Sequence, residues 1–278
     1  MHIFIKDRIK EIYKRFDSHQ ISVFSAQMAF FLFLAVFPFI VFILSLASTL
    51  NLDINLFIVI LRNTFPAEIS DMIEKFLEEY VFAGNIGLLF ISGVFTIGAV
   101  SRSIFALIKA FNIIYGHTEK RSYIKLRLIG FLYTFILIFS IIVTIALPTI
   151  GDGFFAFTSK YIEFPPYFEE IFYLINVALN LAVYVFFILL IHKELPAGDM
   201  KYKQVIYGSI FSILGWFILS RGFNFFVFIF TGYALVYGTL ASFFVLMMWM
   251  YFVSLVMMLG AEINSTICCY RVTGGRFI

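Results

Sequence analysis

Long uninterrupted runs of apolar residues dominate the pattern along the chain. The clearest run, Thr239 to Leu259, holds 21 residues without a charged side chain. A helix of that length spans roughly 31 Å, which matches the hydrocarbon core of a bilayer. Five similar segments precede it. The pattern predicts an all-α membrane protein whose six transmembrane helices lie at about 21–50, 86–113, 128–149, 171–191, 204–230 and 237–265.

Two segments outside these spans have an amphipathic pattern instead. In residues 1–20, apolar residues recur at helical spacing opposite a basic face, which is typical of a helix lying on an anionic membrane surface. A signal peptide is the alternative, but the apolar segment that follows is too long for one, so we expect an uncleaved anchor. Residues 51–85 predict an extracytoplasmic amphipathic helix. We expect residues 1–278 to form a single membrane domain.

The composition is that of a membrane protein and argues against a disulfide framework and a zinc site. The chain is 62% hydrophobic and only 13% charged, whereas a soluble domain is about half apolar and about a quarter charged. The two cysteines, Cys268 and Cys269, are adjacent, so neither a disulfide framework nor a zinc site is predicted.

The distribution of charge predicts the orientation. With both termini inside, 15 of the 20 basic residues fall on the cytoplasmic side and only 3 on the other. Because basic residues are enriched in cytoplasmic loops, we expect both termini to be cytoplasmic. The chain would then be a multi-pass protein of a bacterial cytoplasmic membrane.

Polar residues inside the spans are candidate functional groups at two depths. The inner level holds Gln27, Arg102, Glu262 and Asn264. Because a charge inside the membrane is costly, we hypothesise an Arg102–Glu262 pair with Gln27 close by. The alternative is that both charges extend separately to the lipid headgroups.

A second polar group is predicted at the outer level, from Asn176 and Asn180 on one span and Arg221 and Asn224 on the next. These side chains would line an outward-facing cavity, or alternatively form hydrogen bonds between helices. Pro38 should kink the first span, and Gly260 is a candidate hinge.

Enzymatic signatures are absent from the sequence. There is no P-loop, no H-E-x-x-H and no G-x-S-x-G, and we expect the loops to be too short to form a nucleic-acid-binding groove. We therefore expect no catalytic residues, no metal, no cofactor and no nucleic-acid partner. Membrane lipids are the expected partners; envelope proteins and a homo-oligomer remain open.

Several motifs together resemble the YihY/BrkB family of bacterial inner-membrane proteins. They are SAQMAFFLFLAVFPFIVFILSL (Ser25–Leu46), Leu195-Pro196, Tyr237-Gly238-Thr239-Leu240-Ala241, Trp249-Met250-Tyr251 and Gly260-Ala261-Glu262-Ile263-Asn264. The resemblance covers nearly the whole chain and implies six spans. Family members have carried ribonuclease and virulence labels, and some are connected with envelope lipid traffic.

These observations favour a non-enzymatic transport protein for lipid or another amphipathic envelope molecule, without an ATPase of its own. A solute or ion transporter and a structural partner of an envelope complex are the alternatives.

Overall fold

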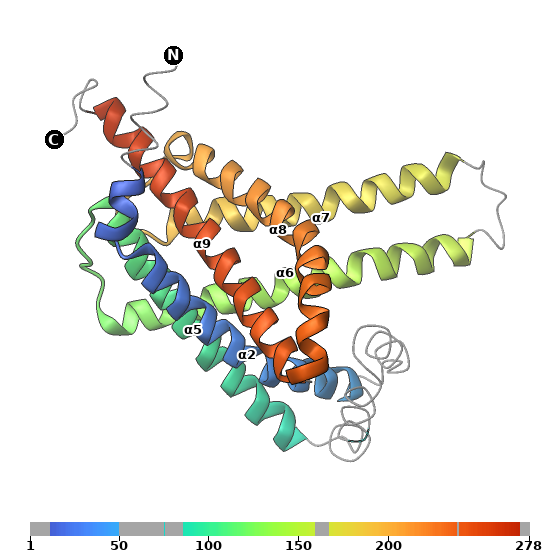
Figure 1. The fold of residues 1–278 in the computed structure, drawn as a ribbon. Helices are drawn as coiled ribbons and strands as arrows, with labels where there is room; N and C mark the ends of the chain where they lie inside the picture. The colour runs from blue at the N-terminus through green and yellow to red at the C-terminus, as the bar shows by residue number, and fades with distance from the viewer. Residues whose placement is uncertain (1–11, 50–74, 76–85, 159–166, 238, 273–278) are drawn as a thin grey trace. The chain divides into compact units, whose positions relative to one another are not determined.

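The computed structural model describes residues 12–49, 75, 86–158, 167–237 and 239–272, and its regular elements there are all helical. Residues 12–18 form a short helix before the first long one. The long helices in Figure 1 are α2 (Ile21–Thr49), α5 (Ile86–Tyr115), α6 (Tyr123–Thr158), α7 (Tyr167–Glu194), α8 (Tyr202–Tyr237) and α9 (Thr239–Val272). The predicted all-α fold is therefore confirmed.

Each long helix contains a segment apolar enough to cross a bilayer. The six candidate spans are Ile21–Thr49, Ile86–Tyr115, Tyr123–Ile141, Glu170–Glu194, Tyr202–Gly222 and Phe243–Ile267. α6 extends past both ends of its predicted span and continues through Pro148. Membrane helices tolerate proline because neighbouring groups satisfy the backbone that it frees. Pro38 likewise lies inside α2, and its predicted kink stays a prediction. The predicted helix at 51–85 falls, apart from Lys75, outside the described residues.

The chain divides into two compact units, although we expected a single domain. The first comprises Met1–Ser22, Leu107–Ile218 and Leu255–Ile278, and the second Val23–Ala106 and Leu219–Ser254. Within the second unit, the Ser103 hydroxyl donates to the Met28 carbonyl at 3.3 Å, which joins α5 to α2.

In the first unit, α6 packs along α7, and the two run side by side in Figure 1. Next to them, α8 meets α9 at glycines. A Cβ added to Gly208 would lie 2.6 Å from Asn264 Cγ and closer still to the Gly260 carbonyl oxygen. The backbones of α8 and α9 therefore touch here, which is how small residues bring membrane helices together.

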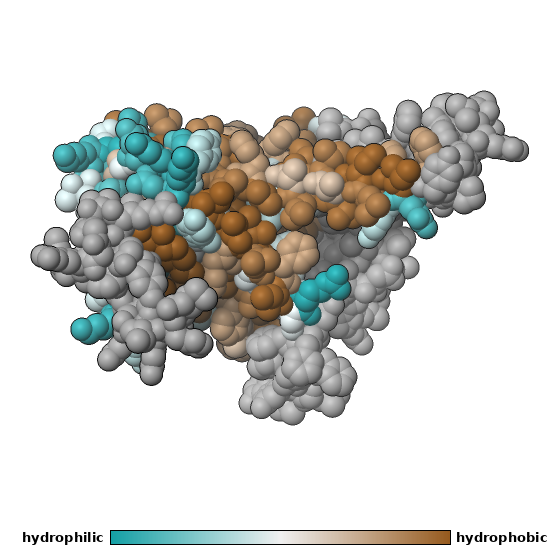
Figure 2. Space-filling model, turned by 90° about the horizontal axis from the view of Figure 1, so that it is seen from above, coloured by the Kyte–Doolittle hydropathy of each residue, from teal (hydrophilic) through white to brown (hydrophobic). Residues whose placement is uncertain are grey.

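Apolar side chains cover much of the described surface visible in Figure 2. On α6 and α7 many are exposed, among them Leu132, Phe135, Phe139, Leu174 and Phe186. A hydrophobic exterior of this kind is expected where lipid replaces water as the solvent.

Gly208→Ala should destabilise the protein by about 1–3 kcal/mol, because the new methyl group would overlap the α9 backbone. Gly222 lies farther along α8 with nothing within 4 Å of an added Cβ. Gly222→Ala is therefore the matched control, and we expect it to be neutral or stabilising. Thermal unfolding of the purified protein in detergent measures both. Equal stability of the two variants would contradict the close approach at Gly208.

Candidate functional site

A buried amide joins two loops of the first unit, the α5–α6 loop (116–122) and the α7–α8 loop (195–201). Asn112 lies near the end of α5, and its Nδ2 donates to Glu119 Oε2 at 2.8 Å. Its Oδ1 accepts from the backbone N–H of Ala197 at 2.7 Å. One side chain thereby holds both loops in place.

Arg121 makes a second link between the same loops. Its Nη2 donates to Glu119 Oε2 at 2.7 Å and to the Leu195 carbonyl at 2.9 Å, and its Nε donates to Glu119 Oε1 at 2.8 Å. Hydrogen bonding from the Arg121 side chain is the main cause that lowers the pKa of Glu119 from 4.5 to about 2. The pair is therefore ionised at neutral pH.

Local sequence explains how the α5–α6 loop turns. Gly116 ends α5 with a φ of 67°, a left-handed conformation that favours glycine. The backbone N–H groups of Gly116 and His117 donate to Ile113 and Asn112 carbonyls, the two bonds of a Schellman motif. Ser122 then caps α6, since its Oγ accepts from the Lys125 N–H at 3.4 Å.

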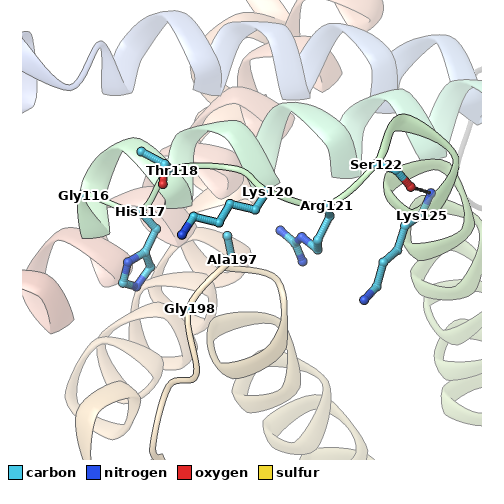
Figure 3. Close-up of a pocket in the computed structure, with 9 residues that line it drawn as sticks. All are labelled: Gly116, His117, Thr118, Lys120, Arg121, Ser122, Lys125, Ala197 and Gly198. Atoms are coloured by element: carbon cyan, nitrogen blue, oxygen red, sulfur yellow. Dashed lines mark hydrogen bonds between the residues drawn. The ribbon is translucent and has the colours of Figure 1, made fainter.

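Between these loops lies a cavity of about 480 Å³. Figure 3 shows its lining, which is Gly116, His117, Thr118, Lys120, Arg121, Ser122, Lys125, Ala197 and Gly198. Three of these residues are basic and none is acidic. Gly198 leaves the space that the His117 ring occupies, because an added Cβ would lie 2.7 Å from its Cε1.

Glu262 is the most deeply placed charge of the first unit and is fully buried on α9. His19 Nδ1 lies 2.8 Å from its Oε2, and Arg15 Nη1 lies 3.5 Å from its Oε1. No hydrogen bond reaches Oε1 within the described part of the chain. The segment before α2 is thus tied to α9 by charge.

Other buried polar groups of the first unit form hydrogen bonds within one helix or between two helices. The Gly208 N–H donates to Asn264 Oδ1 at 2.6 Å, and the Ser265 hydroxyl donates to the Ile114 carbonyl at 2.7 Å. His192 is fully buried, and its Nδ1–H donates to the Ile188 carbonyl at 3.0 Å. Gly260 packs against Ser212 and His192, while its predicted hinge role stays a prediction.

The predicted inner-level residues fall in different units. Glu262 and Asn264 belong to the first unit, whereas Gln27 and Arg102 belong to the second and are exposed. The Arg102 guanidinium lies over the Phe31 ring at 5.8 Å, as the headgroup alternative would allow. The Arg102–Glu262 pair stays a prediction. Sequence reasoning missed Arg15 and His19 as the partners that Glu262 has within its own unit.

The predicted outer-level residues also fall in different units. Asn176 and Asn180 share a face of α7, where Asn180 Nδ2 donates to the Asn176 carbonyl at 3.1 Å. Arg221 and Asn224 lie on the part of α8 that belongs to the second unit, and Arg221 is exposed. The outward-facing cavity therefore stays a prediction.

The basic cavity was not predicted from the sequence. Lys120, Arg121 and Lys125 were used there only to infer the orientation of the chain in the membrane. The signal that could have found it is Asn112, a polar residue at the end of an apolar span. Among the described residues, no group of three or more His, Cys, Asp or Glu side chains could hold a metal ion.

Comparisons with known proteins give one family over nearly the whole chain. The family described as virulence factor BrkB matches residues 12–274. Ribonuclease-like protein YfkH of Bacillus subtilis is 27% identical over 257 residues, covering 92% of this chain and 94% of YfkH. A UPF0761 membrane protein of Haemophilus influenzae is 24% identical over 266 residues, covering 92% of this chain and 93% of that protein. No solved structure matches.

Removing both side chains that face Glu262, in the variant Arg15→Gln/His19→Ala, should destabilise the protein by about 3–5 kcal/mol, because it leaves a buried carboxylate without these partners. Adding Glu262→Gln to this variant should recover part of the loss, because the buried charge is then gone. Thermal unfolding of the double and triple variants measures the recovery. A triple variant less stable than the double variant would contradict the charge pairing.

The Glu119–Arg121 pair should make stability depend on pH. Because the folded pKa of Glu119, about 2, lies below the unfolded value, its contribution is complete above about pH 4.5. That contribution is lost as the pH falls from there toward 2. The difference in melting temperature between wild type and Glu119→Gln should therefore shrink over this range. In an Arg121→Gln background the pH-dependent difference should largely disappear. A difference that stays constant from pH 7 to pH 3 would refute the assignment.

Proposed function

Since the chain belongs to the family described as virulence factor BrkB, we propose that it moves lipid or another amphipathic envelope molecule through the cytoplasmic membrane. The proposal includes cytoplasmic termini, as the charge distribution favours, and no ATPase within this chain. The substrate would be amphipathic because the site that carries the proposal is itself amphipathic.

The observation that carries the proposal is a basic cavity with exposed apolar residues next to it on the same helix. Lys125 lines the cavity from the first turn of α6. Its neighbours on the same helix, Ile124 and Leu128, are 71% and 61% exposed. The candidate span of α6 begins at Tyr123, so the cavity lies where that span leaves the hydrocarbon. A charged headgroup in the cavity would thus leave its acyl chains beside apolar side chains.

Buried polar groups in the first unit support transport over a purely structural role. Glu262, Asn264 and His192 are each fully buried within helices that contain candidate spans. Such groups are costly in a membrane and often mark pathways for substrates or ions.

A second candidate function, transport of a solute or ion, is favoured by one contact. His19 and Glu262 are two titratable groups 2.8 Å apart, which suits a proton relay. This candidate predicts uptake into liposomes driven by a gradient and no movement of lipid between leaflets. A structural partner of an envelope complex would do neither.

Purified protein in liposomes should move a fluorescent anionic phospholipid between leaflets faster than empty liposomes do, as measured by quenching of the outer leaflet with a reducing agent. Lys120→Gln/Lys125→Gln should slow this movement because it removes two of the three basic side chains that line the cavity. Lys201→Gln/Lys203→Gln is the matched control, since both lysines are exposed and neither lines the cavity. No movement by correctly folded protein in any anionic lipid would contradict the proposed function.

A further inference from the structure

We propose that the cavity between the α5–α6 and α7–α8 loops is a binding site for a phosphate ester, held by Lys120, Lys125 and Ser122. The phosphate would come from a lipid headgroup or from a soluble phosphate ester, which share this chemistry. This proposal names the ligand chemistry of the site that carries the proposed function. It rests on that function only if the phosphate belongs to a lipid.

The cavity carries positive charge that the protein does not itself neutralise. Of its three basic residues, Arg121 is committed to the Glu119 carboxylate. Neither the Lys120 nor the Lys125 ammonium has a hydrogen-bond or ion-pair partner in the described ranges, and both side chains are exposed. These two lysines face one cavity whose lining has no carboxylate. They therefore favour an anionic ligand with one or two negative charges.

Neutral donors at the same cavity suit phosphate oxygens. The Ser122 oxygen accepts from the Lys125 N–H, which leaves its hydroxyl proton available to a ligand. Ser122 also marks the N-terminus of α6, a 36-residue helix whose first N–H groups favour an anion. The His117 ring lines the same cavity, but its Nε2 is buried against Gly198 and is not one of these donors.

The donors are held on a rigid frame. The His117 ring stacks on Tyr115, with centroids 6.1 Å apart, and Gly198 borders its other atoms. Asn112 and Arg121 fix the loop that carries Lys120, through the bonds to Glu119, Leu195 and Ala197. A loop that is already ordered loses little conformational entropy on binding.

The size of the cavity points to an ester rather than to a bare anion. Its volume of about 480 Å³ lies within the range of small-molecule sites, about 300–1,000 Å³, and far exceeds that of one phosphate group. Figure 3 shows the side chains of Lys120 and Arg121 directed into the space beside Ala197, with Lys125 farther along the same side. A headgroup could therefore occupy the cavity beyond its phosphate.

Isothermal titration of the full-length protein in phosphatidylcholine nanodiscs tests the site. The probes are dihexanoyl phosphatidic acid, dihexanoyl phosphatidylglycerol, dihexanoyl phosphatidylcholine, glycerol 3-phosphate and inorganic phosphate. We expect the anionic esters to bind, and Lys120→Gln/Lys125→Gln to weaken binding about tenfold or more, because each lysine near an anionic group contributes about fivefold. The control Lys201→Gln/Lys203→Gln should bind within about twofold of wild type.

Binding of the anionic lipids alone assigns the phosphate to a lipid headgroup, and binding of glycerol 3-phosphate as well assigns it to phosphate esters in general. The proposal is overturned if no anionic ester binds, if phosphatidylcholine binds equally well, or if the cavity variant and the control weaken binding equally. Size-exclusion chromatography establishes that each variant is folded. Binding without lipid movement in liposomes would refute the transport function and leave the site; lipid movement without binding would refute the site and leave the function.

Discussion

Hydrocarbon offers no hydrogen bonds, so every polar group that these helices carry into the membrane needs a partner within the protein. Many of the hydroxyl groups find their partner on their own helix. Ser92, Thr96, Thr134, Ser140, Ser209 and Ser254 each donate to a carbonyl four residues back on their own helix. Groups with more than one donor or acceptor cannot be satisfied in this way, so they join different helices and loops. Asn112, Asn264 and Glu262 are examples in the first unit.

The same requirement explains which parts of the structure could be predicted. Length and hydropathy alone determine that a segment must form a helix in a bilayer, so the six spans followed from the sequence. The ends of helices depend on neighbours instead. The predicted span ended at residue 191, yet α7 continues to Glu194 and buries the His192 imidazole. α6 similarly continues beyond residue 149, where its predicted span ended.

The candidate sites were harder to predict because sequence gives the depth of a residue but not its rotation about the helix axis. Arg102 and Glu262 were predicted to share a depth, which suggested a pair, while the side chains that face Glu262 come from a segment 243 residues away in the chain. The basic cavity depends on bonds from Asn112 and Arg121 to residues 85 and 74 positions farther along. No periodicity in the sequence records such contacts.

The contact between the α8 and α9 backbones has a consequence for how the first unit can move. Helices separated by side chains can slide or part as those side chains change rotamer, but Gly208 and Gly260 leave nothing between the two chains to rearrange. An acyl chain has no room to enter there, and the Gly208 N–H bond to Asn264 adds a further tether. α8 and α9 thus form a fixed wall within this unit.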